Sequence, residues 1–380
     1  MYSRNINLPD KQSIFLFGPR GTGKTTLVRR RYPKAVYLDL LEAKTFNELV
    51  GNPDRLEGMI PVGHKEAVII DEVQRIPDLL NEVHRLIESK RYQFVMTGSS
   101  ARKLRRAGTN LLAGRALTYD LFPLTASELG DDCDFQKASK YGLLPTALTS
   151  PTPQKYLESY VRTYLENEVL QEGLTRNIGA FARFLETISF SQGSLINASE
   201  IAREAMVERK VVENYINILE DLLIAKRLPV FSYRAKRKLV THNKFYFFDG
   251  GIYRTLRPTG SLHNPGEIEG VMWESLVWQN LVATNANLGL GYKTYFWRTA
   301  HGVEVDFVLY GQRGLIAIEV KMADKISESD LRGLKTFKDE YPSAKCLVFY
   351  GGDRERSRGD VRIVPIAQAL LNLPEILASA

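Results

Sequence analysis

The amino-acid sequence predicts an α/β protein built from more than one domain. Its 380 residues are too many for a single ordinary hydrophobic core, so two or three domains are expected. Strand and helix patterns alternate through residues 12–125, which is typical of a parallel sheet with helices on both faces. A second group of strand patterns follows residue 300, after a stretch in which helical patterns dominate.

The first region contains five short apolar runs that read as strands. They span residues 13–17, 35–40, 67–71, 93–97 and 116–122. Helical patterns lie between them, for example over residues 79–87. We therefore expect a first domain over residues 1–125, followed by a helical connector over 126–175 that opens with Pro, Gly and acidic residues.

A glycine-rich turn follows the first strand directly. Residues 18–25 fit the pattern G-x-x-x-x-G-K-[ST], in which backbone N–H groups surround phosphate oxygens at the amino end of a helix. Lys24 is expected to reach the β- and γ-phosphates, and Thr25 to bind Mg²⁺ through its hydroxyl. The flanking strand and helix argue against the alternative of a plain surface turn. The predicted nucleotide-binding residues are Gly18, Pro19, Arg20, Gly21, Thr22, Gly23, Lys24, Thr25 and Thr26.

An acidic pair ends the third apolar run. Residues 67–70 are all apolar, which predicts a strand buried on both faces, and Asp71 and Glu72 follow them. Asp71 is expected to bind Mg²⁺ through water, and Glu72 to take a proton from the attacking water as general base. The pair therefore predicts the Walker B element of a nucleotide site.

Two further positions in this region are candidates for catalysis. Small hydroxyl residues end the fourth strand, and Ser99 among them could contact the γ-phosphate or the attacking water, as sensor 1 does in AAA-type ATPases. Capping of the next helix is an equally good explanation of this serine. Arg115 follows Gly114 before the fifth strand and could stabilise phosphoryl charge, in cis or from a neighbouring subunit, or it could be a plain surface arginine.

Residues 176–258 predict a winged helix-turn-helix. A short helix opens with a capping box after Asn197, and a longer helix with one apolar face follows. Two β-rich runs, 230–233 and 244–248, then flank a basic segment that we expect to form the hairpin of the wing. A packing or relay module is the alternative to DNA contact, and the acidic residues of the second helix weaken a groove-reading role. The predicted DNA-binding residues are Arg209, Lys210, Arg234, Lys236, Arg237 and Lys238.

Residues 259–380 predict a further α/β domain with a second candidate site. Two strands, 303–309 and 315–321, are joined by a short turn, and pairing about this turn would place Asp306 opposite Glu319. Two adjacent carboxylates can hold a divalent metal, and Lys321 can orient or help deprotonate an attacking water. Glu274, on an otherwise apolar helix face, is expected to add a third carboxylate. The alternative is a buried carboxylate–lysine ion pair on an ordinary sheet.

Bulk composition is that of an ordinary globular protein, with 44% hydrophobic and 25% charged residues. A net charge of +7 favours polyanionic partners. No apolar run approaches the roughly 20 residues that span a bilayer, and no signal-peptide pattern is present, so a cytoplasmic location is expected. Cys133 and Cys346 suggest neither a disulfide framework nor a zinc site.

These motifs together resemble a prokaryotic ATPase family with an AAA-type core and a C-terminal domain of unknown function. The spacing of Asp306 and Glu319-Val320-Lys321 is also similar to the PD-(D/E)xK signature of restriction-endonuclease-like folds. The family resemblance implies nucleotide binding at Gly18, Gly23, Lys24, Thr25, Asp71 and Glu72.

Two functions from different classes fit this sequence. The first is a DNA-associated enzyme driven by ATP and Mg²⁺, with a metal-dependent nuclease site in its C-terminal domain. The second is a regulatory switch set by nucleotide state, whose C-terminal domain is a catalytically silent scaffold or docking module. Rings are common among AAA-type ATPases, so a homo-oligomer is compatible with both functions, although an arginine acting in cis would let a monomer suffice.

Overall fold

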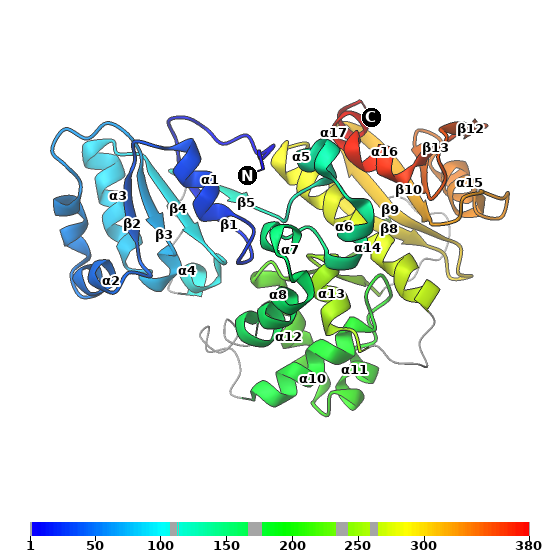
Figure 1. The fold of residues 1–380 in the computed structure, drawn as a ribbon, viewed down its shortest axis with the longest axis horizontal. Helices are drawn as coiled ribbons and strands as arrows, with labels where there is room; N and C mark the ends of the chain where they lie inside the picture. Colours follow the sequence, from blue (N-terminus) through cyan, green and yellow to red (C-terminus); the bar gives the residue numbers. More distant parts are fainter. Residues whose placement is uncertain are drawn as a thin grey trace. The chain divides into compact units, whose positions relative to one another are not determined.

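The computed structural model describes residues 2–106, 112, 114–165, 177–232, 242–258 and 265–379. The chain forms two compact units (Figure 1). The N-terminal unit comprises residues 6–122 and 221–224, and the C-terminal unit comprises 1–5, 123–220 and 225–380. The segments that we expected to be a connector, a winged helix and a nuclease-like domain thus lie largely within one unit.

The N-terminal unit is built on a five-stranded, wholly parallel sheet (Figure 1). Its strand order is β2-β3-β4-β1-β5. The strands are β1 (Ser13–Phe17), β2 (Val36–Asp39), β3 (Val68–Asp71), β4 (Phe94–Gly98) and β5 (Ala116–Asp120). Each strand lies within two residues of its predicted bounds, so the parallel-sheet prediction is confirmed.

Helices cover both faces of this sheet because β1 is apolar on both sides. Phe15 and Phe17 belong to one buried cluster, whereas Ile14 and Leu16 belong to another. The first cluster includes residues of α3, and the second includes Val28 of α1. The helical segments are α1 (Lys24–Arg31), α2 (Ala43–Val50), η1 (Pro53–Met59), η2 (Val73–Arg75), α3 (Leu79–Lys90) and α4 (Arg102–Arg106).

The C-terminal unit begins with a series of short helices. They are α5 (Ala126–Leu129), η3 (Gly130–Asp132), α6 (Phe135–Tyr141), α7 (Pro145–Thr149), α8 (Pro153–Ser159) and the π-helical turn η4 (Tyr160–Leu165). Buried polar contacts tie them to the rest of the unit. The amide of Ala126 donates to Asn280 (2.7 Å), and that of Leu143 donates to Asp249 (2.8 Å).

From residue 177 on, the described residues form three helices and a two-stranded sheet. They are α10 (Ile178–Ser189), α11 (Ala198–Glu204), α12 (Arg209–Asp221), β6 (Ala225–Leu228) and β7 (Lys244–Phe247). β7 pairs with β6 and also bridges residues 192 and 195, which lie between α10 and α11. The prediction that residues 230–233 form one arm of the hairpin is therefore wrong. Val230 instead bridges Phe296, and the Phe231 amide donates to the Phe296 carbonyl, because Phe231 is buried in the core of the following sheet.

The last third forms a six-stranded mixed sheet in the order β12-β13-β11-β10-β9-β8. Its strands are β8 (Lys293–Arg298), β9 (Glu304–Gly311), β10 (Gly314–Lys321), β11 (Lys345–Tyr350), β12 (Arg356–Arg358) and β13 (Val361–Pro365). β9 and β10 pair from Gly311 with Gly314 to Phe307 with Ile318, which is the predicted register.

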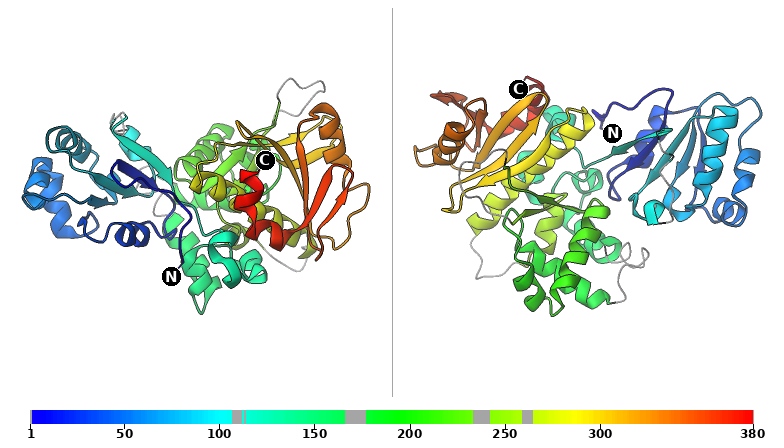
Figure 2. Two further views of the ribbon diagram at one scale, coloured as in Figure 1. Left: turned by 90° about the horizontal axis from the view of Figure 1, so that it is seen from above. Right: turned by 180° about the vertical axis from the view of Figure 1, so that it is seen from behind.

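Helices also pack against this second sheet. Trp278 of α14 (Pro265–Asn287) stacks on Phe307, and Figure 2 shows α14 running alongside the strands. Phe337 of α15 (Arg332–Glu340) contacts Trp297 edge to face. The other helices among the described residues of this unit's last part are α13 (Gly250–Leu256), α16 (Ile366–Leu371) and α17 (Leu373–Ala378). Within the described residues, none of the helices is long and apolar enough to cross a membrane.

Candidate functional site

The glycine-rich turn connects β1 to α1 through a backbone that needs glycine. Gly21 and Gly23 have positive φ angles of 80° and 93°, which side chains other than glycine rarely adopt. A Cβ atom at Gly18 would lie 2.2 Å from the carbonyl oxygen of Leu121. The Thr22 hydroxyl donates to the carbonyl oxygen of Pro19 (2.8 Å) and braces the turn. The shape of the loop therefore depends on its glycines, on the Thr22 hydrogen bond and on the close approach of Leu121.

Lys24 lies over this loop with only 6% of its surface exposed. Its Nζ atom donates to the carbonyl oxygens of Gly18 (2.7 Å) and Pro19 (3.1 Å). These acceptors are neutral dipoles, so an anion entering the loop would compete with them favourably for the ammonium.

Asp71 is where the predicted metal-binding residues come together. The carboxylate is 4% exposed at the end of β3, and its Oδ2 atom accepts a hydrogen bond from the Thr25 hydroxyl (2.7 Å). The hydroxyls of Tyr37 and Thr97 also donate to Asp71. The parallel pairing of β2, β3 and β4 brings Tyr37, Asp71 and Thr97 together, and the pairing of β4 with β1 places the loop and Thr25 at the same carboxyl edge of the sheet.

Tyr37 is a residue of this site that sequence reasoning missed. Burial, followed by its hydrogen bond to Asp71, raises the pKa of the Tyr37 hydroxyl above its ordinary value. The guanidinium of Arg29 on α1 lies 4.0 Å from the centre of the Tyr37 ring. The available signal was its place in the strand next to the one that ends at Asp71.

Glu72 and Ser99 are linked through a third side chain. The amide of Gln74 donates to Glu72 and also to the Ser99 hydroxyl (3.2 Å). Glu72 itself has a φ angle of 61°, in the left-handed region that is uncommon for such a residue. Gln74, also missed from the sequence, therefore connects the predicted general base to the end of β4.

Arg115 does not lie near this edge of the sheet. Ala116 pairs with Ser13, whereas Asp120 pairs with Phe17, so Arg115 precedes β5 at the amino edge. At about 3.3 Å per residue, it is roughly 15–20 Å from the loop. Its exposed side chain forms an ion pair with Glu88 of α3. This position favours the alternative of a plain surface arginine over action in cis, and a role from a neighbouring copy stays a prediction.

The C-terminal carboxylates surround a lysine that sequence reasoning did not include. Lys244 of β7 is 2% exposed, and its Nζ atom lies 2.5 Å from Glu304, 3.4 Å from Glu274 and 3.8 Å from Asp306. The Tyr246 hydroxyl, on the same face of β7, donates to Glu274. A single charged residue beginning the aromatic run 244–248 was the signal for Lys244.

Asp306, Glu319 and Lys321 are neighbours at the ends of β9 and β10. Asp306 accepts from the amide of Val320 (2.9 Å), and Lys321 donates to Glu319 Oε1 (2.6 Å). Glu319 Oε2 is buried without a hydrogen-bond partner among the described residues. Burial, and then the charge of Asp306, raises the pKa of Glu319 to about 8. Burial also raises the pKa of Glu274, against the opposing charge of Lys244.

Two of the predicted metal ligands, Glu274 and Asp306, face an ammonium in this structure. Within the described ranges, no group of three or more His, Cys, Asp or Glu side chains is arranged to hold a metal ion. Glu274 and Asp306 are instead in contact with the ammonium of Lys244. The buried ion pair, which the sequence left open as the alternative, is therefore present.

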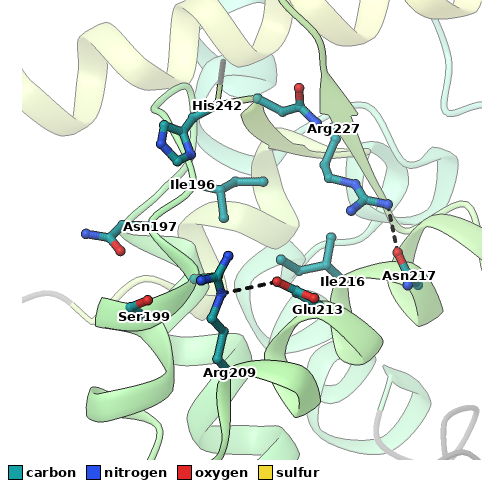
Figure 3. A pocket seen from close by; sticks show the side chains of 11 residues that line it. Ile196, Asn197, Ser199, Arg209, Glu213, Ile216, Asn217, Arg227 and His242 are labelled. Carbon is teal, nitrogen blue, oxygen red and sulfur yellow. Dashed lines mark hydrogen bonds and ion pairs between the residues drawn. The ribbon is translucent and has the colours of Figure 1, made fainter. Parts of the chain in front are cut away.

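A polar hollow of about 360 Å³ lies beside α12 (Figure 3). Arg209 forms an ion pair with Glu213 (3.2 Å), and Arg227 donates to Asn217 (2.7 Å) and Glu220 (2.9 Å). The hollow is lined by Ile196, Asn197, Ala198, Ser199, Arg209, Glu213, Ile216, Asn217, Arg227, His242 and Asn243.

The other predicted DNA-binding residues do not line this hollow among the described residues. Lys210 is exposed on α12 and is absent from the residues that line the hollow. Arg234, Lys236, Arg237 and Lys238 lie outside the described residues.

Three family models match successive parts of this chain. An AAA domain matches residues 10–130, a domain of unknown function (DUF8612) matches 133–263, and another (DUF4143) matches 269–369. Among curated relatives, an uncharacterised protein of Mycobacterium tuberculosis is 27% identical, over 96% of this chain and 83% of the relative. One from Haemophilus influenzae is 21% identical, over 93% of this chain and 88% of the relative.

Solved structures resemble the chain only weakly. The Aeropyrum pernix Orc1 protein in complex with DNA is 14% identical with a TM-score of 0.26, over 66% of this chain and 87% of that one. Protein VC1899 from Vibrio cholerae is 12% identical with a TM-score of 0.23, over 96% of this chain and 97% of that one. At these scores neither structure carries an argument. The family matches show that the chain combines an AAA-type, P-loop ATPase-like domain with a C-terminal DUF4143 domain.

Proposed function

We propose that this chain binds ATP together with Mg²⁺ and hydrolyses it. The observation that carries this proposal is the 2.7 Å hydrogen bond between Thr25 and Asp71, which are 46 residues apart in sequence. A hydroxyl that follows the loop lysine and a carboxylate at the end of another strand of the sheet are the pair that holds Mg²⁺ in P-loop NTPases. Bound Mg²⁺ would neutralise charge on the phosphates.

The other residues of the site have distinct roles in this proposal. Lys24 turns from the carbonyl oxygens of Gly18 and Pro19 toward the phosphates. Glu72, held by Gln74, takes a proton from the attacking water. Ser99, which shares Gln74 with Glu72, orients that water or the γ-phosphate.

Calorimetry of the full chain with ATP and ADP in Mg²⁺ buffer tests nucleotide binding, and phosphate release tests turnover. We expect saturable binding of both nucleotides and slow release of phosphate. Absence of nucleotide uptake would overturn the proposal at its base.

We also propose that the C-terminal unit contacts DNA. The order α10, extended segment, α11, α12, β6 and β7 supports a winged-helix interpretation, and Arg209, Lys210 and Asn214 are exposed on α12. Glu213 pairs with Arg209 and Glu220 pairs with Arg227, which makes these arginines less available for hydrogen bonds to bases. Phosphate contacts are therefore expected to outweigh base contacts. Fluorescence anisotropy with duplex DNA should show affinity that falls steeply with salt; binding without salt dependence would contradict phosphate contact.

The C-terminal carboxylates support two proposals about chemistry. Asp306, Glu319 and Lys321 at adjoining strand ends support a metal-dependent nuclease, whereas the Lys244 ion pairs support a silent scaffold in a nucleotide-controlled switch. Incubation of supercoiled plasmid with Mg²⁺ or Mn²⁺ separates them. If wild-type protein nicks the plasmid and Asp306→Ala protein does not, the nuclease is established. If the plasmid has the same form after incubation with wild type and with Asp306→Ala, the switch is favoured.

A further inference from the structure

Lys244 is a buried charge of the C-terminal unit, 2% exposed, with three acidic partners. Carboxylates from two elements approach its Nζ atom: Glu304 and Asp306 from β9, and Glu274 from α14. Burial alone would lower the pKa of Lys244, but these three charges outweigh it and raise the pKa above its ordinary value. The ammonium is therefore held in the charged state.

The backbone fixes this lysine from both sides. β7 places Lys244 opposite Leu228 of β6, and Lys244 also bridges Leu195. The neighbouring residue Phe245 exchanges main-chain hydrogen bonds with residues 193 and 194. Lys244 thus reaches the carboxylates because a paired strand carries it there, and moving the ammonium away requires β7 to shift.

The surrounding carboxylates are oriented by groups other than Lys244. Tyr246 donates to Glu274, Arg298 pairs with Glu304 (3.1 Å), and the Val320 amide donates to Asp306. Glu319, beside Asp306, has a further buried oxygen without a hydrogen-bond partner in the described part of the chain, and the residue is 7% exposed. Oxygen ligands would therefore remain in place if the ammonium left.

We propose that the Lys244 ammonium occupies the position at which this cluster would otherwise hold a divalent cation, and closes the cluster to metal while β7 stays in place. Hard divalent cations prefer several carboxylate oxygens, which is the set that faces Nζ. The inference rests on the proposed nuclease-like site, because it explains how that site is kept inactive.

Substitution of Lys244 by methionine tests the proposal, because methionine retains length and removes charge. We expect nucleotide-free Lys244→Met protein to bind one more Mn²⁺ per chain than wild type, measured by calorimetry, because binding to the cluster in wild type is at least tenfold weaker or undetectable. The added site should disappear in the double variant Lys244→Met/Asp306→Asn. Lys335→Met, which removes an exposed lysine paired with Glu328, is the matched control and should bind Mn²⁺ as wild type does.

Folding is checked in the same samples. Lys244→Met should lower the melting temperature in EDTA, and Mn²⁺ should restore it; a folded variant that gains no Mn²⁺ site would overturn the proposal. If the variant does not fold, wild type and Asp306→Asn decide the matter. Equal Mn²⁺ binding by these two supports a cluster closed to metal, whereas weaker binding by Asp306→Asn would show that wild type already holds metal there.

The plasmid assay distinguishes this inference from the nuclease proposal. Lys244→Met protein that gains Mn²⁺ but nicks no plasmid would support the inference and remove the nuclease. If wild-type protein nicks plasmid, Asp306→Asn protein does not, and Lys244→Met protein gains no Mn²⁺ site, the nuclease is supported and the inference about Lys244 is removed.

Discussion

Each of the two candidate sites contains a buried lysine, but the two lysines have different partners. Lys24 donates to neutral carbonyl oxygens, and Asp71 accepts from hydroxyls. Lys244 is surrounded by carboxylates. A ligand can replace hydrogen bonds to neutral groups at little net cost, whereas removing one partner of a buried ion pair leaves an uncompensated charge. The comparison therefore supports our two proposals, that the N-terminal site takes up nucleotide and that Lys244 closes the C-terminal cluster; we call them the open site and the closed site.

The largest expected effect is on ATP turnover at the open site. Glu72→Gln keeps the shape of the side chain but cannot accept a proton, so we expect ATP binding to persist while turnover falls by about 10²–10⁴-fold. Phosphate release at saturating ATP measures this loss. Glu66→Gln, on the exposed approach to the same strand, is the control. Loss of ATP binding in Glu72→Gln would show that the acidic pair is assigned wrongly.

Stability tests the closed site. In Lys244→Met the carboxylates lose their buried countercharge, which should lower the free energy of unfolding of the C-terminal unit by about 3–5 kcal/mol in metal-free buffer. Urea denaturation followed by tryptophan fluorescence is suitable because Trp273, Trp278 and Trp297 all belong to this unit. Lys335→Met should change the value by less than about 1 kcal/mol, since its ion pair is exposed. Equal stability of both variants would contradict the role given to Lys244.

The corresponding substitution at the open site should affect the ligand more than the fold. Lys24→Ala removes a charge-assisted contact to phosphate, which is worth about 1.5–3 kcal/mol, so ATP affinity should fall by roughly 10–100-fold or vanish from the measurable range. Calorimetry measures this change, and exposed Lys11→Ala is the control. Unchanged affinity would place the nucleotide elsewhere.

The free energy of unfolding of the C-terminal unit should depend on pH through Glu319, which has no counterpart in the argument for the N-terminal site. The pKa of Glu319 is raised from its ordinary value of 4.5 to about 8 in the folded protein. Between pH 4.5 and pH 8, the folded state therefore keeps a proton on Glu319 that the unfolded state has lost. Stability of the C-terminal unit should therefore fall as pH rises from 4.5 to 8, by at most about 1.4 kcal/mol per pH unit for this proton. Asp306, Lys321 and Lys244 influence the same carboxyl. Glu319→Gln should flatten the slope in urea titrations; an identical slope in this variant would exclude Glu319 as its source.

Much of the open site could be predicted from sequence because its signals are local. The glycines of the loop and the acidic pair follow apolar strands, and parallel pairing must then bring strand ends together. Tyr37 and Gln74 were missed because their roles depend on which side chains meet across strands. The distance of Arg115 from the loop also follows from the sequence, because a residue that precedes a parallel strand lies at the amino edge of the sheet.

The closed site was harder to predict because its central residue comes from a distant segment. The β9–β10 register followed from a short turn, so Asp306 and Glu319 could be placed together. Lys244 enters from β7, whose partner was wrongly expected at residues 230–233. Long-range pairing of this kind leaves no periodic signal in the sequence.

The smallest expected effect concerns Tyr37, which links the open site to β2. Tyr37→Phe removes one of the hydroxyls that donate to Asp71, while Thr25 keeps its 2.7 Å hydrogen bond to the same carboxylate. Loss of one such bond is worth about 1 kcal/mol, so the Mg²⁺ concentration for half-maximal ATP turnover should rise by roughly fivefold. Tyr32→Phe is the matched control, because its hydroxyl donates to the Pro9 carbonyl instead. If both variants keep the wild-type Mg²⁺ requirement, Tyr37 does not position Asp71 for Mg²⁺ binding. The Thr25 hydroxyl would then be sufficient to hold that carboxylate in place.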